Sequence, residues 1–235
     1  MVEVSVNVQV PFVTVIDLWQ HRIYRPVIIE TLPDEALLIV FDFYVDNIHL
    51  EGWITLTHVC RRWRYIIFSS PLRLNLRLCC KGSRPVREML DIWPPFPIEI
   101  YEDCCSEEGV DNIIAALEHH DHVYRIYISS MSSSLLERIT GEMLVPFWEL
   151  TVLALHSNEL NLVLPETLLG GSAPSLRSCY LANLPFPALR KLLLSASHLV
   201  TLSLEEIPYS GYIPPEVMVT CLSAATCLKS LVLGF

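Results

Sequence analysis

The apolar positions in the second half of the chain repeat in a six-residue unit, L-x-x-L-x-L. Six segments match this unit, with replacements at some positions, and they start at residues 95, 123, 150, 176, 199 and 228. In a β-strand the fourth and sixth positions point to the same side, so both can enter one core. The intervals of 23–29 residues between these starts leave room for one strand and one returning helix. The pattern therefore predicts six strands of a parallel sheet.

The segments between these units have the spacing of amphipathic helices. Four of them are predicted to be helical: 109–120, 134–144, 186–197 and 214–225. In the first, Ile113, Ile114 and Leu117 fall on one face. In the second, Ser134 is followed three residues later by Glu137, which is the arrangement of a capping box. The last two segments have proline near the first turn, where its missing N–H does no harm.

Two segments of the first half also have helical spacing. Over residues 32–46, Leu37 and Phe41 recur on one side, and Pro33 followed by two acidic residues is typical of a first turn. Over residues 56–67 a continuous apolar stripe predicts one helix, with three arginines largely off the stripe. The stripe consists of Leu56, Val59, Cys60, Trp63 and Ile67.

Alternating patterns predict strands at two further places. After Pro71, every second residue is leucine, at positions 72, 74, 76 and 78. At the N-terminus, valines alternate with polar residues, so residues 1–29 are predicted to form an edge strand or a loosely attached arm. This segment lacks the basic start of a secretory signal.

Four elements follow one another in the first third of the chain. They are Leu32-Pro33, the helix with Phe41, the run VCRRWR at 59–64, and Ser70-Pro71. Together they resemble an F-box, over residues 30–75. The resemblance implies a three-helix module that docks on a Skp-type adaptor and through it on a cullin.

By this resemblance five residues are expected to face or support the adaptor: Leu32, Pro33, Leu38, Val59 and Trp63. For Val59 and Trp63, a place in the core of the module is an equal alternative. One sequence does not separate two apolar faces on so short a helix.

The six units with their intervening helices resemble irregular leucine-rich repeats. The asparagine that this family has at the ninth position is matched only by Asn158, and Met131, Leu184 and Ile207 occupy the corresponding places. The expected fold class is α/β: an N-terminal three-helix F-box followed by an irregular leucine-rich-repeat solenoid with a parallel sheet. The expected parts are an arm (1–29), the F-box (30–75), a linker strand and helix (76–94), and a repeat domain (95–235) without a C-terminal cap.

This order of parts implies a substrate receptor of an SCF-type ubiquitin ligase, with the repeats binding a protein client. Client contacts are expected at strand positions that point outward: Thr151, Ala154, Arg177, Tyr180, Thr201 and Ser203. The neighbouring Glu205 and Glu206 favour a basic client. Two alternatives stay open: a scaffold that acts outside ubiquitin ligases, and an enzyme that resembles an F-box by accident.

Composition narrows the class of partner. The chain has 235 residues, of which 52% are apolar, and this is enough for a sizeable core. Its net charge is −10, and residues 95–235 carry 6 basic against 16 acidic side chains. Binding of nucleic acid needs a basic surface, so none is expected for this part. No run of about 18 apolar residues occurs, so no membrane span is expected either.

The remaining chemistry favours a binding protein. Eight cysteines without a CxxC pair are expected to be reduced thiols of a cytoplasmic or nuclear protein. The histidines of HHDH (119–122), with Cys104 and Cys105, raise the question of zinc, but they lack the regular spacing of zinc ligands. Motifs for a catalytic nucleophile or a phosphate loop are absent. No catalytic residue, metal or cofactor is therefore expected.

Overall fold

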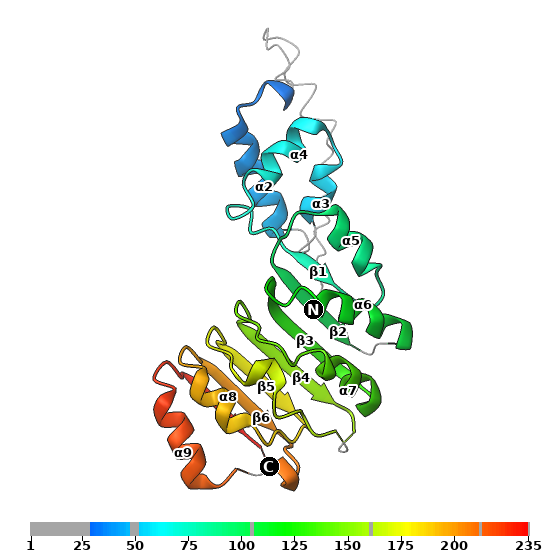
Figure 1. Ribbon diagram of the computed structural model, residues 1–235. Coiled ribbons are helices and arrows are strands. Elements are labelled where there is room, and N and C mark those ends of the chain that lie inside the picture. The colour runs from blue at the N-terminus through cyan, green and yellow to red at the C-terminus, as the bar shows by residue number, and fades with distance from the viewer. Residues whose placement is uncertain (1–28, 48–51, 104–105, 160–161, 212, 235) are drawn as a thin grey trace, which may run out of the picture.

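The computed structural model describes residues 29–47, 52–103, 106–159, 162–211 and 213–234. Within these ranges a helical part precedes a seven-stranded sheet (Figure 1). The arm or edge strand expected for residues 1–29 lies outside the described residues, apart from Ile29.

The helical part consists of a short 3₁₀ turn and three α-helices. Their bounds are η1 (Ile29–Thr31), α2 (Asp34–Asn47), α3 (Gly52–Thr57) and α4 (Arg61–Phe68). The helix predicted over residues 32–46 is confirmed as α2, and Leu37 and Phe41 on it are fully buried. Asp34 and Glu35 lie in its first turn, where carboxylates interact favourably with the helix dipole.

The single helix predicted over residues 56–67 is wrong. The chain leaves the helical conformation between α3 and α4, and Cys60 adopts an extended backbone at the start of α4. The Arg64 side chain donates to the Thr57 carbonyl (3.0 Å), so a side chain satisfies the end of α3 in place of a continued helix. As a result Val59 and Cys60 are exposed, whereas the flanking members of the stripe are buried or half-buried.

The strand predicted for the leucines from 72 to 78 is mostly wrong. After Pro71 the chain turns, and the Leu76 N–H bonds back to the Pro71 carbonyl (3.0 Å). Leu72 projects into solvent with 94% of its surface exposed, while Leu74 and Leu76 turn into the core. Only the last of the four leucines begins a strand, because local turn hydrogen bonds take up the backbone before it.

Seven strands form one open, parallel sheet whose spatial order equals the chain order. Their bounds are β1 (Leu78–Cys80), β2 (Ile98–Asp103), β3 (Val123–Met131), β4 (Val152–Ser157), β5 (Ser178–Ala182), β6 (Thr201–Glu205) and β7 (Ser230–Leu233). The six strands predicted from the repeated unit are confirmed as β2 to β7. The sheet also includes β1, which pairs with β2, so it begins before residue 95.

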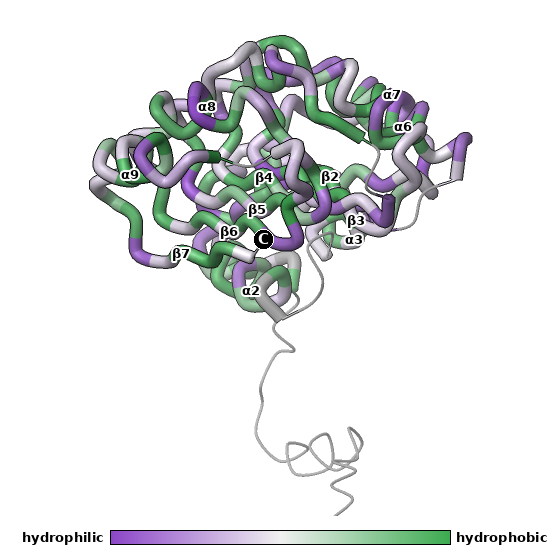
Figure 2. Tube along the Cα trace, turned by 90° about the horizontal axis from the view of Figure 1, so that it is seen from below, coloured by the Kyte–Doolittle hydropathy of each residue, from purple (hydrophilic) through white to green (hydrophobic). Residues whose placement is uncertain are grey.

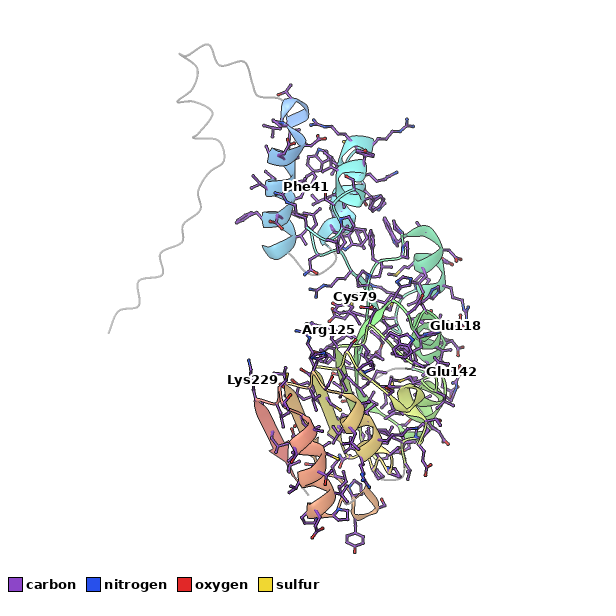
Figure 3. All side chains as sticks on the ribbon, turned by 60° about the vertical axis from the view of Figure 1, so that its left-hand side comes forward. Phe41, Cys79, Glu118, Arg125, Glu142 and Lys229 are labelled. Carbon is purple, nitrogen blue, oxygen red and sulfur yellow. The ribbon has the colours of Figure 1, made fainter. Side chains whose placement is uncertain are left out.

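Helices pack on one side of this sheet (Figures 1 and 2). The helical segments are α5 (Val86–Ile92), α6 (Glu107–Leu117), α7 (Ser133–Gly141), η2 (Leu168–Gly171), α8 (Leu189–Ser195), η3 (Tyr209–Gly211) and α9 (Pro215–Ala224). The four predicted helices correspond to α6, α7, α8 and α9. Figure 3 shows Glu118 and Glu142 on the helical side and Arg125 on the opposite side.

The core lies between the sheet and its helices, in rows that run across the strands. One row joins Ile126, Leu153, Cys179 and Leu202, all aligned in register and fully buried. Each of these residues is the fourth of its unit, so burial of the repeated positions explains the pattern. Burial raises the pKa of the Cys179 thiol to about 12, so this cysteine behaves as an apolar core residue.

The capping box predicted at Ser134 and Glu137 is wrong. Helix α7 starts one residue earlier, with Ser132 at the N-cap, and no side-chain cap hydrogen bond comes from it. The carboxylate of Glu159 instead accepts a hydrogen bond from the Ser133 N–H (3.2 Å). The helix N-terminus is thus satisfied from the neighbouring repeat, which local sequence does not indicate.

The turns after the strands replace an asparagine by apolar side chains. Met131, Leu184 and Ile207, at the ninth position of their units, are buried. Just before them, Ser130, Asn183 and Glu206 adopt positive φ angles of 55°, 58° and 52°. This left-handed residue turns the chain from the strand to the helical side, and it is favourable for asparagine and costly for most other residues.

Glu206 therefore carries strain that a substitution can remove. We expect Glu206→Asn to raise the free energy of unfolding by about 0.5–1 kcal/mol, and Glu206→Val to lower it by about 1 kcal/mol or more. Urea denaturation followed by circular dichroism measures both. Equal stability of the two variants would contradict the left-handed turn at this position.

Candidate interaction surfaces

The three helices of the helical part pack on one another, and an aromatic pair joins α4 to α2. The rings of Phe41 and Trp63 lie 4.7 Å apart between centroids, and Figure 3 shows Phe41 between the two helices. Ile67 is fully buried on the same helix as Trp63. Trp63 is thus half-buried and supports the interior of the module.

The arginines of the run VCRRWR have structural partners. Arg62 donates to the Asp34 carboxylate (2.6 Å) and to the Leu32 carbonyl, and so fixes the start of α2 against α4. Arg64 binds the end of α3, as described above. Two of the three arginines, Arg62 and Arg64, are therefore used within the module.

The five expected adaptor residues divide into two groups. Pro33 and Val59 are exposed, Val59 with 56% of its surface. Leu32, Leu38 and Trp63 are half-buried and pack against the core. For Trp63 and Val59 the sequence left open a place in the core of the module or on its surface. Trp63 lies on the interior side, and Val59 lies on the surface.

A larger apolar surface lies on the outer side of α2. Ile39, Val40 and Phe43 are exposed by 62%, 49% and 72%. Their spacing of three and four residues places them on one helix face, opposite Leu37 and Phe41. We call these three residues the outer face of α2. Sequence reasoning missed it, although the unbroken apolar run LLIVF is wider than one buried face requires.

Two phenylalanines on α2 allow the core and the outer face to be compared directly. We expect Phe41→Ala to lower the free energy of unfolding by about 3–5 kcal/mol, because it empties a buried site. Phe43→Ala should change it by no more than about 0.5 kcal/mol, because Phe43 is mostly solvated. Thermal and urea denaturation measure both, and a large loss for Phe43→Ala would show that the outer face is part of the fold.

An aromatic and ionic joint connects the helical part to the sheet. Trp53 packs edge-on against Trp93 and Phe96, with ring centroids 5.2 and 5.4 Å away, and its indole N–H donates to the Arg77 carbonyl (3.1 Å). Arg77 in turn lies 3.7 Å from the carboxylate of Glu99 on β2. The module is thus fixed to the first strands by contacts on both sides of Arg77.

Glu99 is a buried carboxylate on the open side of the sheet. It accepts a hydrogen bond from the Tyr124 hydroxyl (2.8 Å), and Arg77 and Arg125 lie 3.7 and 3.9 Å away. Burial, and then the hydrogen bond to Glu99, raise the pKa of Tyr124, so its hydroxyl stays a donor. The cluster joins residues on or next to β1, β2 and β3, although the Nε atom of Arg125 is buried in it without a hydrogen-bond partner.

A shallow groove of about 270 Å³ crosses the open side of the sheet. Its lining combines tyrosines with small residues and includes Tyr101, Tyr127, Ala154, Tyr180, Ser203 and Glu205. Of the six expected client contacts, Ala154, Tyr180 and Ser203 line the groove. The other three, Thr151, Arg177 and Thr201, lie outside it at the beginnings of the strands.

Metal and membrane chemistry receive no support within the described ranges. No three His, Cys, Asp or Glu side chains there come close enough to hold a metal ion. Cys104 and Cys105, which raised the question of zinc, lie outside those ranges. None of the helices described combines the length and the apolarity needed to cross a bilayer.

Two comparisons with known proteins found no match for this chain: neither a protein-family model nor a curated protein matches its sequence. The chain is therefore interpreted from its own surfaces: the outer face of α2 and the groove on the sheet.

Proposed function

We propose that the chain is a substrate receptor of an SCF-type ubiquitin ligase. In this proposal the helical part is an F-box that docks on a Skp-type adaptor, and the sheet part is an irregular leucine-rich-repeat domain that binds a protein client. The observation that carries it is the outer face of α2, a solvent-exposed apolar face on a module with the residue pattern of an F-box.

The energetics of α2 support a partner at this face. A helix that is apolar on both sides is expected to be buried on both sides. Leu37 and Phe41 fill the inner side, while Ile39, Val40 and Phe43 are exposed by 62%, 49% and 72%. Burial of each large apolar side chain stabilises a complex by roughly 1.5–3 kcal/mol, so an adaptor groove over α2 gains a substantial interface core.

The architecture of the sheet supports the repeat assignment. Strands follow one another in chain order, each returns through a segment on the same side, and left-handed residues mark several of the turns. Stacking of such units leaves one face of the sheet open for a client. The departure from the family pattern is chemical: buried Met131, Leu184 and Ile207 replace the asparagine ladder.

The proposed role is positional. The receptor makes and breaks no bonds, and it holds the client near an activated ubiquitin and so raises the local concentration. The joint around Trp53 matters for this role, because it holds the adaptor-binding helices and the client-binding sheet in one arrangement.

Adaptor binding tests the proposal. The double variant Ile39→Ser with Phe43→Ser should weaken association with a purified Skp-type adaptor by about 100-fold or more, measured by biolayer interferometry. A matched control is Ile92→Ser with Val219→Ser, because these residues on α5 and α9 are exposed by 72% and 63%, against 72% and 62% for the test pair.

The control pair should bind the adaptor as the unmodified chain does. If the unmodified chain does not associate, or if both pairs bind equally well, the docking proposal fails. Client degradation in cells then separates a ligase receptor from an adaptor-bound scaffold. A ligase receptor should lose client degradation with the Ile39→Ser and Phe43→Ser pair, whereas a scaffold should not affect it.

A further inference from the structure

The groove on the sheet has an ordered lining. Tyr101, Tyr127, Ala154, Tyr180 and Ser203 are neighbours across five successive strands, from β2 to β6, in one register row. All five side chains lie on the open side, because they alternate with residues that face the helical side, such as Ile126, Leu153 and Cys179, which are fully buried. The row is therefore an aromatic floor.

The middle of this floor is notched. Ala154 lies between Tyr127 on β3 and Tyr180 on β5, and its methyl group is much shorter than either ring. All three residues line the groove, which indicates that the hollow forms over the small side chain. A notch between two tyrosine rings accepts an aliphatic or aromatic side chain.

Carboxylates lie at the two ends of the next row. Asp103 on β2 accepts a hydrogen bond from Ser129 (2.9 Å), and Glu205 on β6 accepts one from Ser203 (2.6 Å). These bonds orient the carboxylates while leaving the side chains exposed. No lysine or arginine is among the described residues that line the groove, although His156 is.

Three basic side chains lie at the other ends of the strands. Arg125 is in register with Glu99 near the start of β3, and Arg177 and Lys229 directly precede β5 and β7. Apart from Glu99, which is paired with arginines, and Lys81, charge is therefore separated along the strands, with carboxylates where the strands end. A segment that crosses the strands over the tyrosine row meets the acidic edge.

One cation of the chain already uses this floor. The Lys81 ammonium lies 5.5 Å from the centre of the Tyr101 ring, within cation–π range. Lys81 occupies the β2 end of the row, so Tyr127 and Tyr180 are the rings open to a ligand.

We infer that the groove binds an extended, basic segment of a client protein. The inference rests on the proposed function, in which the sheet part holds the client. Two cationic side chains of the segment meet Asp103 and Glu205, and an apolar side chain between them enters the notch over Ala154. Asp103 and Glu205 are four strand intervals apart, roughly 19 Å at about 4.8 Å per interval. An extended chain covers that distance in about five or six residues.

The probe is a fluorescein-labelled peptide with arginine at positions 1 and 7 and leucine at position 5, so that in an extended chain all three side chains point to the same face. Fluorescence anisotropy measures its binding to the full chain in complex with the adaptor, or to the full chain alone. A peptide with glutamate in place of both arginines is the charge control, and one with serine in place of leucine tests the notch. We expect the first peptide to bind and each of the other two to bind about tenfold or more weakly. Added salt should lower the affinity of the first peptide.

Matched variants locate the site. Ala154→Phe fills the notch and should weaken binding about tenfold or more, whereas Ser178→Phe, on the same face but outside the groove, should leave binding unchanged. Asp103→Asn with Glu205→Gln keeps the oxygens that accept from Ser129 and Ser203 and removes the charge. This double variant should bind the arginine peptide about tenfold more weakly, and Glu206→Gln should bind it with unchanged affinity.

The outcomes separate this inference from the proposed function. If the glutamate peptide binds as well as the arginine peptide, if Ala154→Phe and Ser178→Phe behave alike, or if no arginine peptide binds, the inference is overturned. Adaptor association is measured on the same samples. If the chain binds the arginine peptide but not the adaptor, the ligase-receptor proposal is rejected and the groove for a basic segment is kept. If the chain binds the adaptor but not the peptide, only the groove is rejected.

Discussion

The structure depends on one constraint: successive strands pair with each other while burying their apolar side chains on the helical side of the sheet. Strands β3 to β6 meet this constraint, whereas the last strand described, β7, leaves Leu231 and Leu233 exposed by 41% and 39%. The row from Ile126 to Leu202 shows the consequence, because each member is aligned with the next and none is exposed. A shift of one residue in any strand would move its leucines to the open side and its polar residues into the core. The repeated unit therefore determines both the register and the side on which the helices pack.

This constraint also creates the open side of the sheet. Because the returning segments pack on the helical side, the alternate positions of the strands lie on the open side, where Tyr101 and Tyr180 are exposed and Glu99 and Ser203 are buried. Those positions can vary in chemistry, and here they supply tyrosines, alanine and serine in one row. The helical part follows a different rule: the outer face of α2 is apolar, and Ile39 and Val40 on it are exposed by 62% and 49% among the described residues.

Periodic signals made most of the fold predictable. Strands β2 to β7 and helices α6 to α9 follow from positions that recur over whole elements. The errors lie where a single distant contact decides the local conformation. Arg64 binds the end of α3, and Glu159 caps α7 from another repeat. After Pro71, turn hydrogen bonds keep the leucines before Leu78 out of the strand. Such contacts join residues that the sequence pattern does not relate.

The interaction surfaces were predictable only in part. Strand alternation identified Ala154, Tyr180 and Ser203 as outward, but register alone brought them together with Tyr101 and Tyr127 from earlier strands. Resemblance directed attention to Val59 and Trp63, and the structure places the larger exposed apolar area on α2 instead. The surroundings of Glu99, two arginines and a tyrosine from other segments, follow from the register of the strands and have no local signal in the sequence.

Hydrogen–deuterium exchange of the chain alone and mixed with a purified Skp-type adaptor tests the central claim most directly. The account predicts a complex in which the amides of α2 become strongly protected while those of β4, β5 and β6 exchange as before. An absence of complex, or protection confined to the sheet with α2 unchanged, would contradict adaptor docking through the outer face of α2.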